Sequence, residues 1–197
     1  MAIKLTKRVS GIAESATLAI SAKAKQLKAE GKDIVNFGVG EPDFNTPDYI
    51  IEAAYTAMKD GRTKYTPASG ITELKKAVVE ETERATGLKY SPSQVVIGAG
   101  AKQPLYNAIA ATVEEGDEVV IPSPYWVTYP ELVKYCGGKC VFAETKPQNG
   151  YKMTAEELES VITGNTRALI LNSPNNPTGA VYTRKELEEI AVVLEKH

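Results

Sequence analysis

The stretch ALILNSPNNPTGAVY, residues 168–182, sets an apolar run directly against a loop. The run 168–171 has the length and composition of a strand, and the eight residues after it hold three Asn, two Pro and one Gly. Proline fixes φ, glycine permits positive φ and asparagine bonds its own backbone, so each favours a turn. A plain turn needs fewer of them. We therefore expect a strand that ends in a loop shaped to present something.

The alternation of short strands and helices extends over the chain from residue 95 onward. Strands are predicted at 95–97, 119–121, 140–143 and 167–171. Helices are predicted at 103–113, 129–135, 154–162 and from 183 onward. The last two helices begin with capping boxes, at Thr154 and Thr183. Short β-branched runs between helices favour an α/β fold, with a largely parallel sheet that has helices on both faces.

The first ninety residues have a different pattern. Helices are predicted at 16–30, 47–60 and 71–86, and a short strand at 33–37. We interpret this part as an extended arm plus helices laid against the α/β core. At the other end the chain stops at His197, inside a helix with no C-cap and no following strand, so it looks cut.

Composition and charge exclude several classes of partner. Hydrophobic residues make up 43% of the chain and charged residues 24%, as in ordinary globular proteins. The net charge of -2 gives no reason to expect nucleic acid or an anionic membrane as a partner. No apolar stretch approaches the roughly 20 residues of a membrane span, and no signal peptide is evident, so we expect a cytoplasmic protein. Cys136 and Cys140 are predicted to be reduced thiols, and with His197 as the single histidine we expect no metal site.

Three loops are expected at carboxyl ends of strands, where open α/β sheets bind ligands. Residues 98–103 offer small residues and a helix start that attracts anions, although a plain helix start fits them equally. Residues 122–129 hold the single Trp, which suits either a flat ligand or closure of the core. With the loop after residue 171, they predict a pocket for a phosphorylated aromatic ring.

Five segments together are far more specific than any one of them. They are VGEPDF at 39–44, YTPASG at 65–70, GAGAKQ at 98–103, PYW at 124–126 and SPNNPTG at 173–179. Their order resembles that of class I aminotransferases, which are pyridoxal-phosphate enzymes of fold type I. The residues within the segments are most similar to those of bacterial aspartate aminotransferases. The resemblance covers essentially all 197 residues, which correspond to about the first half of a family chain.

The resemblance implies a pyridoxal-phosphate-dependent-transferase-like fold, present as an incomplete large domain plus an N-terminal arm. Residues 1–45 would form the arm and part of a small domain, and residues 46–197 the N-terminal part of the large cofactor-binding domain. By the same resemblance, Asn176 hydrogen-bonds the phenolic oxygen of pyridoxal 5'-phosphate and also lines the substrate site. Trp126 stacks on the cofactor ring beside the substrate.

Further roles follow from the same matching. Ala101 and Lys102 would supply backbone N–H groups to the cofactor phosphate, so Lys102 is not the Schiff-base lysine. Tyr65 resembles the tyrosine that reaches the phosphate of the neighbouring subunit, which implies a homodimer with shared sites. Gly40 matches the glycine whose backbone meets the substrate carboxylate. Ser15 and Thr17 would line the pocket for the substrate side chain.

The implied reaction is ping-pong transamination between an amino acid and a 2-oxo acid. The similarity of the motifs to those of aspartate aminotransferases favours aspartate and 2-oxoglutarate as the substrates. The Schiff-base lysine, the aspartate for the pyridine nitrogen and the anion-binding arginines would lie beyond the position that matches His197. No catalytic residue is therefore assigned in this chain, and we expect a portion of an aminotransferase. Ala13 and Glu14 stand where prephenate-using relatives have a Lys, which disfavours prephenate.

Two alternatives stay open. Within the family, related enzymes act on alanine, aromatic or branched amino acids, or eliminate from cysteine conjugates. Outside catalysis, the chain would be a binding or dimerisation module that uses the fold without the lysine. A truncated sheet edge and exposed core surface argue against a stand-alone module, because they are liabilities for solubility.

Overall fold

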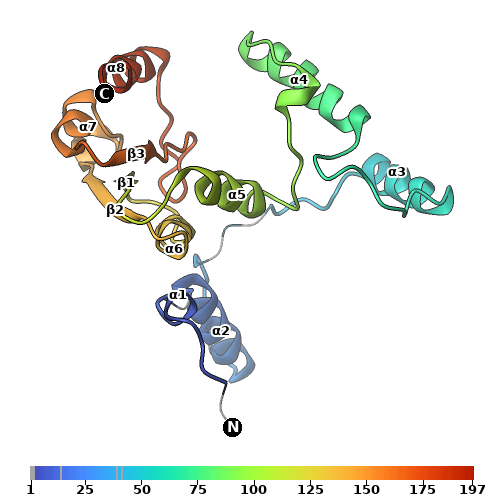
Figure 1. Ribbon diagram of the computed structural model, residues 1–197. Coiled ribbons are helices and arrows are strands. Elements are labelled where there is room, and N and C mark those ends of the chain that lie inside the picture. The colour runs from blue at the N-terminus through green and yellow to red at the C-terminus, as the bar shows by residue number, and fades with distance from the viewer. Residues whose placement is uncertain (1–2, 14, 39, 41) are drawn as a thin grey trace. The chain divides into compact units, whose positions relative to one another are not determined.

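Strand β1 (Glu118–Ser123) lies in the middle of a parallel sheet, between β2 (Lys139–Glu144) and β3 (Thr166–Leu169) (Figure 1). In the register, Glu118 lies opposite Lys139 on one side and Thr166 on the other. The computed structural model describes residues 3–13, 15–38, 40 and 42–197. The predicted parallel sheet is confirmed for these three strands.

The two faces of the sheet bury different side chains, because successive residues of a strand point to opposite sides. Val120 belongs to a cluster with residues of α7 (Ala155–Val161) and α8 (Arg184–Lys196), which cover one face (Figure 1). The other members of this cluster are Ala143, Met153, Leu158, Tyr182, Ile190 and Val193. Helix α6 (Thr128–Tyr135) contacts β1 and β2, and the predicted packing of helices on both faces is confirmed.

Local sequence explains where the helices begin. Thr154 and Thr183 each accept a hydrogen bond from the backbone N–H three residues later, and the glutamate there bonds back to the threonine N–H. Both predicted capping boxes are confirmed. Four further helical elements are α1 (Lys7–Ser10), α2 (Ala16–Ala29), α5 (Lys102–Thr112) and the short 3-10 helix η2 (Pro147–Asn149).

The chain forms two compact units. One unit comprises the residues up to Ile34 together with Tyr106–His197, and the other is Val35–Leu105. The second unit holds α3 (Asp48–Lys59), α4 (Thr72–Thr86), η1 (Pro92–Gln94) and the start of α5. The domain boundary predicted between residues 45 and 46 stays a prediction.

Two predicted strands are wrong. Residues 33–37 and 95–97 adopt no strand conformation in the structure. A strand needs a second backbone that satisfies its N–H and C=O groups in a ladder. Among the described residues, the run at 95–97 has one isolated contact of this kind, in which the Ile97 N–H donates to Ser69 O at 3.0 Å. This run is not buried either, since Val96 is 65% exposed. An apolar run of three residues is too short to predict a paired strand.

Candidate cofactor site

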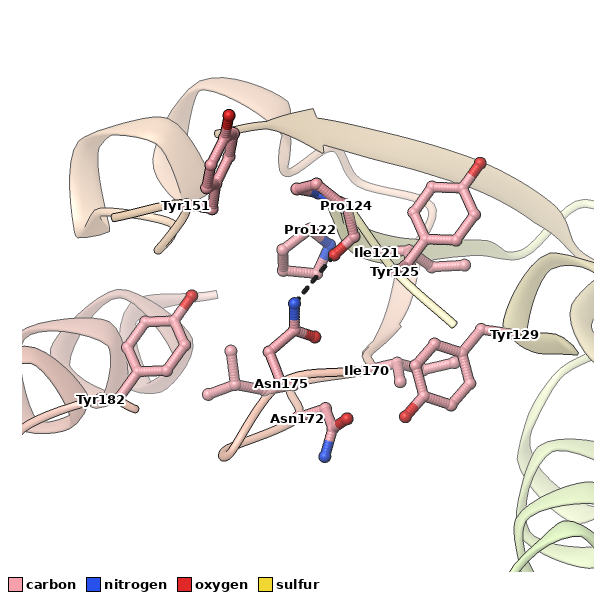
Figure 2. Close-up of a pocket in the computed structure, with 11 residues that line it drawn as sticks. Ile121, Pro122, Pro124, Tyr125, Tyr129, Tyr151, Ile170, Asn172, Asn175 and Tyr182 are labelled. Carbon is pink, nitrogen blue, oxygen red and sulfur yellow. Dashed lines mark hydrogen bonds between the residues drawn. The ribbon is translucent and has the colours of Figure 1, made fainter. Parts of the chain in front are cut away.

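The loops that follow β1 and β3 meet at one edge of the sheet. Since β1 and β3 are parallel neighbours, their carboxyl ends lie at the same edge, which is where open α/β sheets bind ligands. The carboxamide Nδ2 of Asn175 donates to the backbone oxygen of Pro124 at 3.1 Å, as Figure 2 shows. Residues some fifty positions apart are joined there by one side chain.

The loop after β3, residues 172–180, is closed by the backbone of Asn175. The Asn175 N–H donates to Ala180 O at 2.9 Å, and the Gly179 N–H donates to Asn175 O at 2.8 Å. Gly179 has φ of 70°, which glycine adopts without the steric cost that a Cβ would bring. This closure explains the surplus of turn-forming residues in the stretch.

Asn176 stands inside that closed loop with an exposed side chain. Its backbone N–H donates to Oδ1 of Asn172 at 3.2 Å. Its carboxamide has no hydrogen-bond partner among the residues that the structure describes. An amide group offers two donor hydrogens and an acceptor oxygen, so Asn176 presents both functions for a ligand.

Trp126 lies in the loop after β1, just before α6, and is half-buried. Its ring meets the ring of Tyr129 edge to face, with centroids 5.4 Å apart and planes at 87°. The Tyr129 N–H also donates to Trp126 O at 3.0 Å, which fixes the loop to the start of the helix. The ring of the adjacent Tyr125 stacks on the ring of Phe142 in β2, with centroids 4.9 Å apart. The loop thus carries two anchored aromatic rings.

A small cavity of about 10 Å³ lies beneath these two loops. Tyr125, Tyr129, Tyr151, Asn175 and Tyr182 are among its lining residues (Figure 2). The volume has room for about one water molecule, so this space does not itself hold an aromatic cofactor. The surfaces that could contact an aromatic ring are instead the exposed polar and aromatic groups of the two loops.

Tyr182 anchors the end of the loop after β3. Its hydroxyl accepts a 2.7 Å hydrogen bond from the N–H of Met153, and its own N–H donates to Oγ of Ser173 at 3.1 Å. Burial raises the pKa of the Tyr182 phenol, an effect that the bond from Met153 opposes. Next along the chain, Lys152 and the Thr183 N–H hydrogen-bond Glu186 and lower the pKa of its carboxyl to about 2.

Four other predicted site residues, Gly40, Tyr65, Ala101 and Lys102, belong to the second unit. Lys102 is the first residue of α5, and Ala101 directly precedes it. The start of a helix is the positive end of its dipole, which favours an anion nearby. An added Cβ on Gly98 would lie 2.6 Å from Cγ of Pro104, so only glycine fits against the first turn.

Three further predicted contacts fall at exposed or helix-start positions. Tyr65 is fully exposed and Gly40 is exposed, with nothing within 4 Å of a Cβ built on Gly40. Ser15 caps α2, and its hydroxyl lies 2.9 Å from that of Thr17. Val39, Glu41 and Glu14 lie outside the described residues. The cofactor and substrate roles assigned to all these residues stay predictions.

The donor set fits pyridoxal phosphate. The exposed Asn176 carboxamide suits a phenolic oxygen, and the anchored Trp126 ring lies on the neighbouring loop of the same sheet edge. The sequence indicates that Asn175 can hydrogen-bond at the end of the strand, but it does not reveal that Asn175 and Tyr182 fix the loop. The doubled asparagine was a usable signal for Asn175, because two adjacent amides on a turn point in different directions. Nothing comparable marks Tyr182.

Two kinds of site find no support in the part of the chain that the structure describes. No group of three or more His, Cys, Asp or Glu side chains is gathered as for a metal ion. No helix there has both the length and the apolar character that a bilayer crossing requires. Cys136 and Cys140 are free thiols, and burial raises the pKa of both.

Comparison with known proteins also points to the aminotransferases. Residues 32–197 match the family described as aminotransferase class I and II. The chain is 49% identical over 195 residues to the aspartate aminotransferase of Bacillus subtilis, covering 99% of this chain and 50% of that protein. It is 50% identical over 193 residues to the aspartate/prephenate aminotransferase of Cereibacter sphaeroides, covering 98% and 48%.

Solved structures agree on the fold. The aspartate aminotransferase of Thermus thermophilus with maleate matches with a TM-score of 0.95 and 44% identity, covering 100% of this chain and 51% of that chain. The chain therefore spans about half the length of the relatives it matches. The predicted α/β fold of the pyridoxal-phosphate transferases is confirmed. On these grounds the chain belongs to the class I and II aminotransferases.

Proposed function

We propose that this chain supplies one part of the active site of an aminotransferase that moves an amino group from L-aspartate to 2-oxoglutarate. The observation that carries the proposal is the sheet edge where the Trp126 loop and the Asn176 loop are joined through Asn175 and Pro124. The 49% identity to the Bacillus subtilis aspartate aminotransferase supports the choice of substrate.

The family uses pyridoxal 5'-phosphate, which when bound supplies the electron sink for removal of the Cα proton and carries the amino group. Asn176 donates a hydrogen bond to the phenolic oxygen of the cofactor and so stabilises its phenolate form. Trp126 packs against the ring, and an aromatic contact of this kind contributes about 0.5–1.5 kcal/mol beyond area burial.

The remaining roles rest on the resemblance and on the nature of each position. The N–H groups of Ala101 and Lys102, at the start of α5, bind the phosphate, and each favourable charge contact with a helix start is worth about 0.3–1 kcal/mol. Gly40 offers its backbone to the substrate carboxylate. Tyr65, fully exposed in this chain, reaches the phosphate in the neighbouring subunit of a homodimer. We further propose a cytoplasmic, biosynthetic enzyme.

A titration of the chain with pyridoxal phosphate tests the cofactor site. Trp126 is the single tryptophan, so quenching of its fluorescence reports binding next to it. We expect saturable quenching, and an affinity about tenfold lower in Asn176→Ala, since one hydrogen bond to a charged oxygen is lost. Asn165→Ala, at the opposite end of β3, is the matched control and should bind as the wild type does. Unsaturable quenching in the wild type would overturn the proposal.

Borohydride reduction of the same mixture tests the role of Lys102. Because Lys102 is assigned to the phosphate, we expect no stoichiometric lysine adduct on peptide mapping. A single adduct at Lys102 would refute that assignment.

The amino-acid specificity needs a measurement of turnover. In a chimera, this chain replaces the matching half of the Bacillus subtilis enzyme, and glutamate formation is followed with aspartate, alanine, aromatic and branched amino acids. Prephenate is included as an amino acceptor, since the Cereibacter sphaeroides relative is named for it. We expect aspartate to give the highest kcat/KM and prephenate little turnover. Preference for another amino acid would replace aspartate in the proposal.

A further inference from the structure

Asn175 uses its whole side-chain donor group within the protein. Nδ2 donates to Pro124 O at 3.1 Å and to Oγ1 of Thr178 at 2.9 Å. An amide nitrogen carries two hydrogens, and a backbone carbonyl can only accept, so the orientation of this carboxamide is fixed by its partners. Figure 2 shows the side chain directed at Pro124. None of this donor capacity is left for a ligand.

The two ends of this bridge are the two loops of the candidate site. On one side the bond holds Pro124, two residues before Trp126. On the other side the Asn175 backbone closes the loop that contains Asn176, through bonds to Ala180 and Gly179. Asn175 is half-buried, and its side chain and backbone together bond to both loops.

We propose that Asn175 is a positioning residue that holds the Asn176 carboxamide in register with the Trp126 ring, so that both contact the same cofactor. This inference rests on the proposed function, which assigns Asn176 and Trp126 to the cofactor. Asn175 itself touches neither cofactor nor substrate. Its contribution is the fixed separation of two loops that come from different strands.

The test variant is Asn175→Asp, which keeps the shape of the side chain and removes its donor. A carboxylate oxygen would then face the Pro124 carbonyl oxygen, and the bridge is replaced by repulsion. Asn175→His is the rescue variant, because histidine Nδ1 stands the same number of bonds from Cα as Nδ2 of asparagine and can donate. Asn165→Asp makes the same chemical change at the far end of β3 and serves as control.

The first readout needs no ligand. Time-resolved fluorescence anisotropy of Trp126, the single tryptophan, reports how firmly its loop is held. We expect an added fast component in Asn175→Asp and wild-type behaviour in Asn175→His and Asn165→Asp. Unchanged anisotropy in Asn175→Asp would overturn the coupling of the loops, whether or not the chain binds pyridoxal phosphate.

The second readout is the affinity for pyridoxal phosphate, measured by quenching of Trp126. We expect a five- to tenfold weaker affinity in Asn175→Asp, about the effect of one lost hydrogen bond, and recovery in Asn175→His. If the wild type binds and Asn175→Asp binds equally well, the positioning role is wrong while the proposed function stands. If the wild type does not bind, the proposed function fails, and the cofactor part of this inference fails with it. The anisotropy measurement then still tests whether Asn175 couples the two loops.

Discussion

The hydroxyl group of Tyr182 accepts a 2.7 Å hydrogen bond from the N–H of Met153, which lies 29 residues earlier in the chain. Both residues are buried in the cluster between the sheet and helices α7 and α8. The bond therefore ties the end of the Asn176 loop to the segment that leads into α7. A loop rich in turn residues is held by the core at its far end.

Tyr182→Phe should lower the free energy of unfolding by about 1–3 kcal/mol, because it leaves the buried N–H of Met153 without a partner. Chemical denaturation of the chain measures this. Tyr151→Phe is the matched control, since Tyr151 lines the same cavity but is 41% exposed. Equal losses in the two variants would mean that the Tyr182 hydroxyl contributes nothing specific.

Glu186 should make stability depend on pH. The hydrogen bond from Lys152, and next that from the Thr183 N–H, lower its pKa from 4.5 to about 2. Since the folded pKa lies below the unfolded one, this contribution is present above about pH 5 and is lost as the pH falls towards about 2. The carboxylate is a third exposed, so solvent screening keeps the effect modest.

The pH effect is measured as the difference in unfolding free energy between the wild type and Glu186→Gln. We expect that difference to be largest near neutral pH and to shrink on acidification. Glu189→Gln, which removes a carboxylate 3.7 Å from the exposed Lys185, is the matched control for loss of a surface ion pair. A difference for Glu186→Gln that grows at low pH would contradict the assignment.

Gly98→Ala should weaken binding of pyridoxal phosphate. The added methyl group would lie 2.6 Å from Cγ and 2.7 Å from Cδ of Pro104, so the first turn of α5 must shift. Overpacking of this size costs about 1–3 kcal/mol. Isothermal titration with the cofactor should show a loss of about tenfold or more in affinity. Gly164→Ala, with nothing within 4 Å of its added carbon, should bind normally.

Trp126→Phe and Trp126→Leu separate stacking from simple burial. Phenylalanine keeps an aromatic face, so its affinity for pyridoxal phosphate should fall only a few-fold. Leucine loses the aromatic contribution of about 0.5–1.5 kcal/mol as well, which is up to roughly another tenfold. Absorbance titration serves here, because both variants lack the fluorescent residue. Equal affinities would argue that Trp126 only closes the core.

Sequence patterns predicted the elements whose cause is local. The capping boxes at Thr154 and Thr183 set helix starts within a few residues, and the helix over 71–86 ends at Gly87 in a left-handed conformation as glycine allows. The strand predicted at 95–97 is wrong because pairing depends on a partner elsewhere in the chain. The role of Asn175 was hidden for the same reason, since its acceptor on Pro124 is distant in sequence.

The order of the strands also has a consequence for the folding pathway. The register pairs Glu118 with Lys139 and with Thr166, so the β1–β3 pairing closes a loop more than twice as long as the β1–β2 pairing. The added closure entropy is under about 1 kcal/mol, which favours the shorter closure a few-fold. Until β3 pairs with β1, the hydrogen bond from Asn175 to Pro124 has no defined partner. The sheet edge at which we propose the cofactor binds is thus among the last of these features to form.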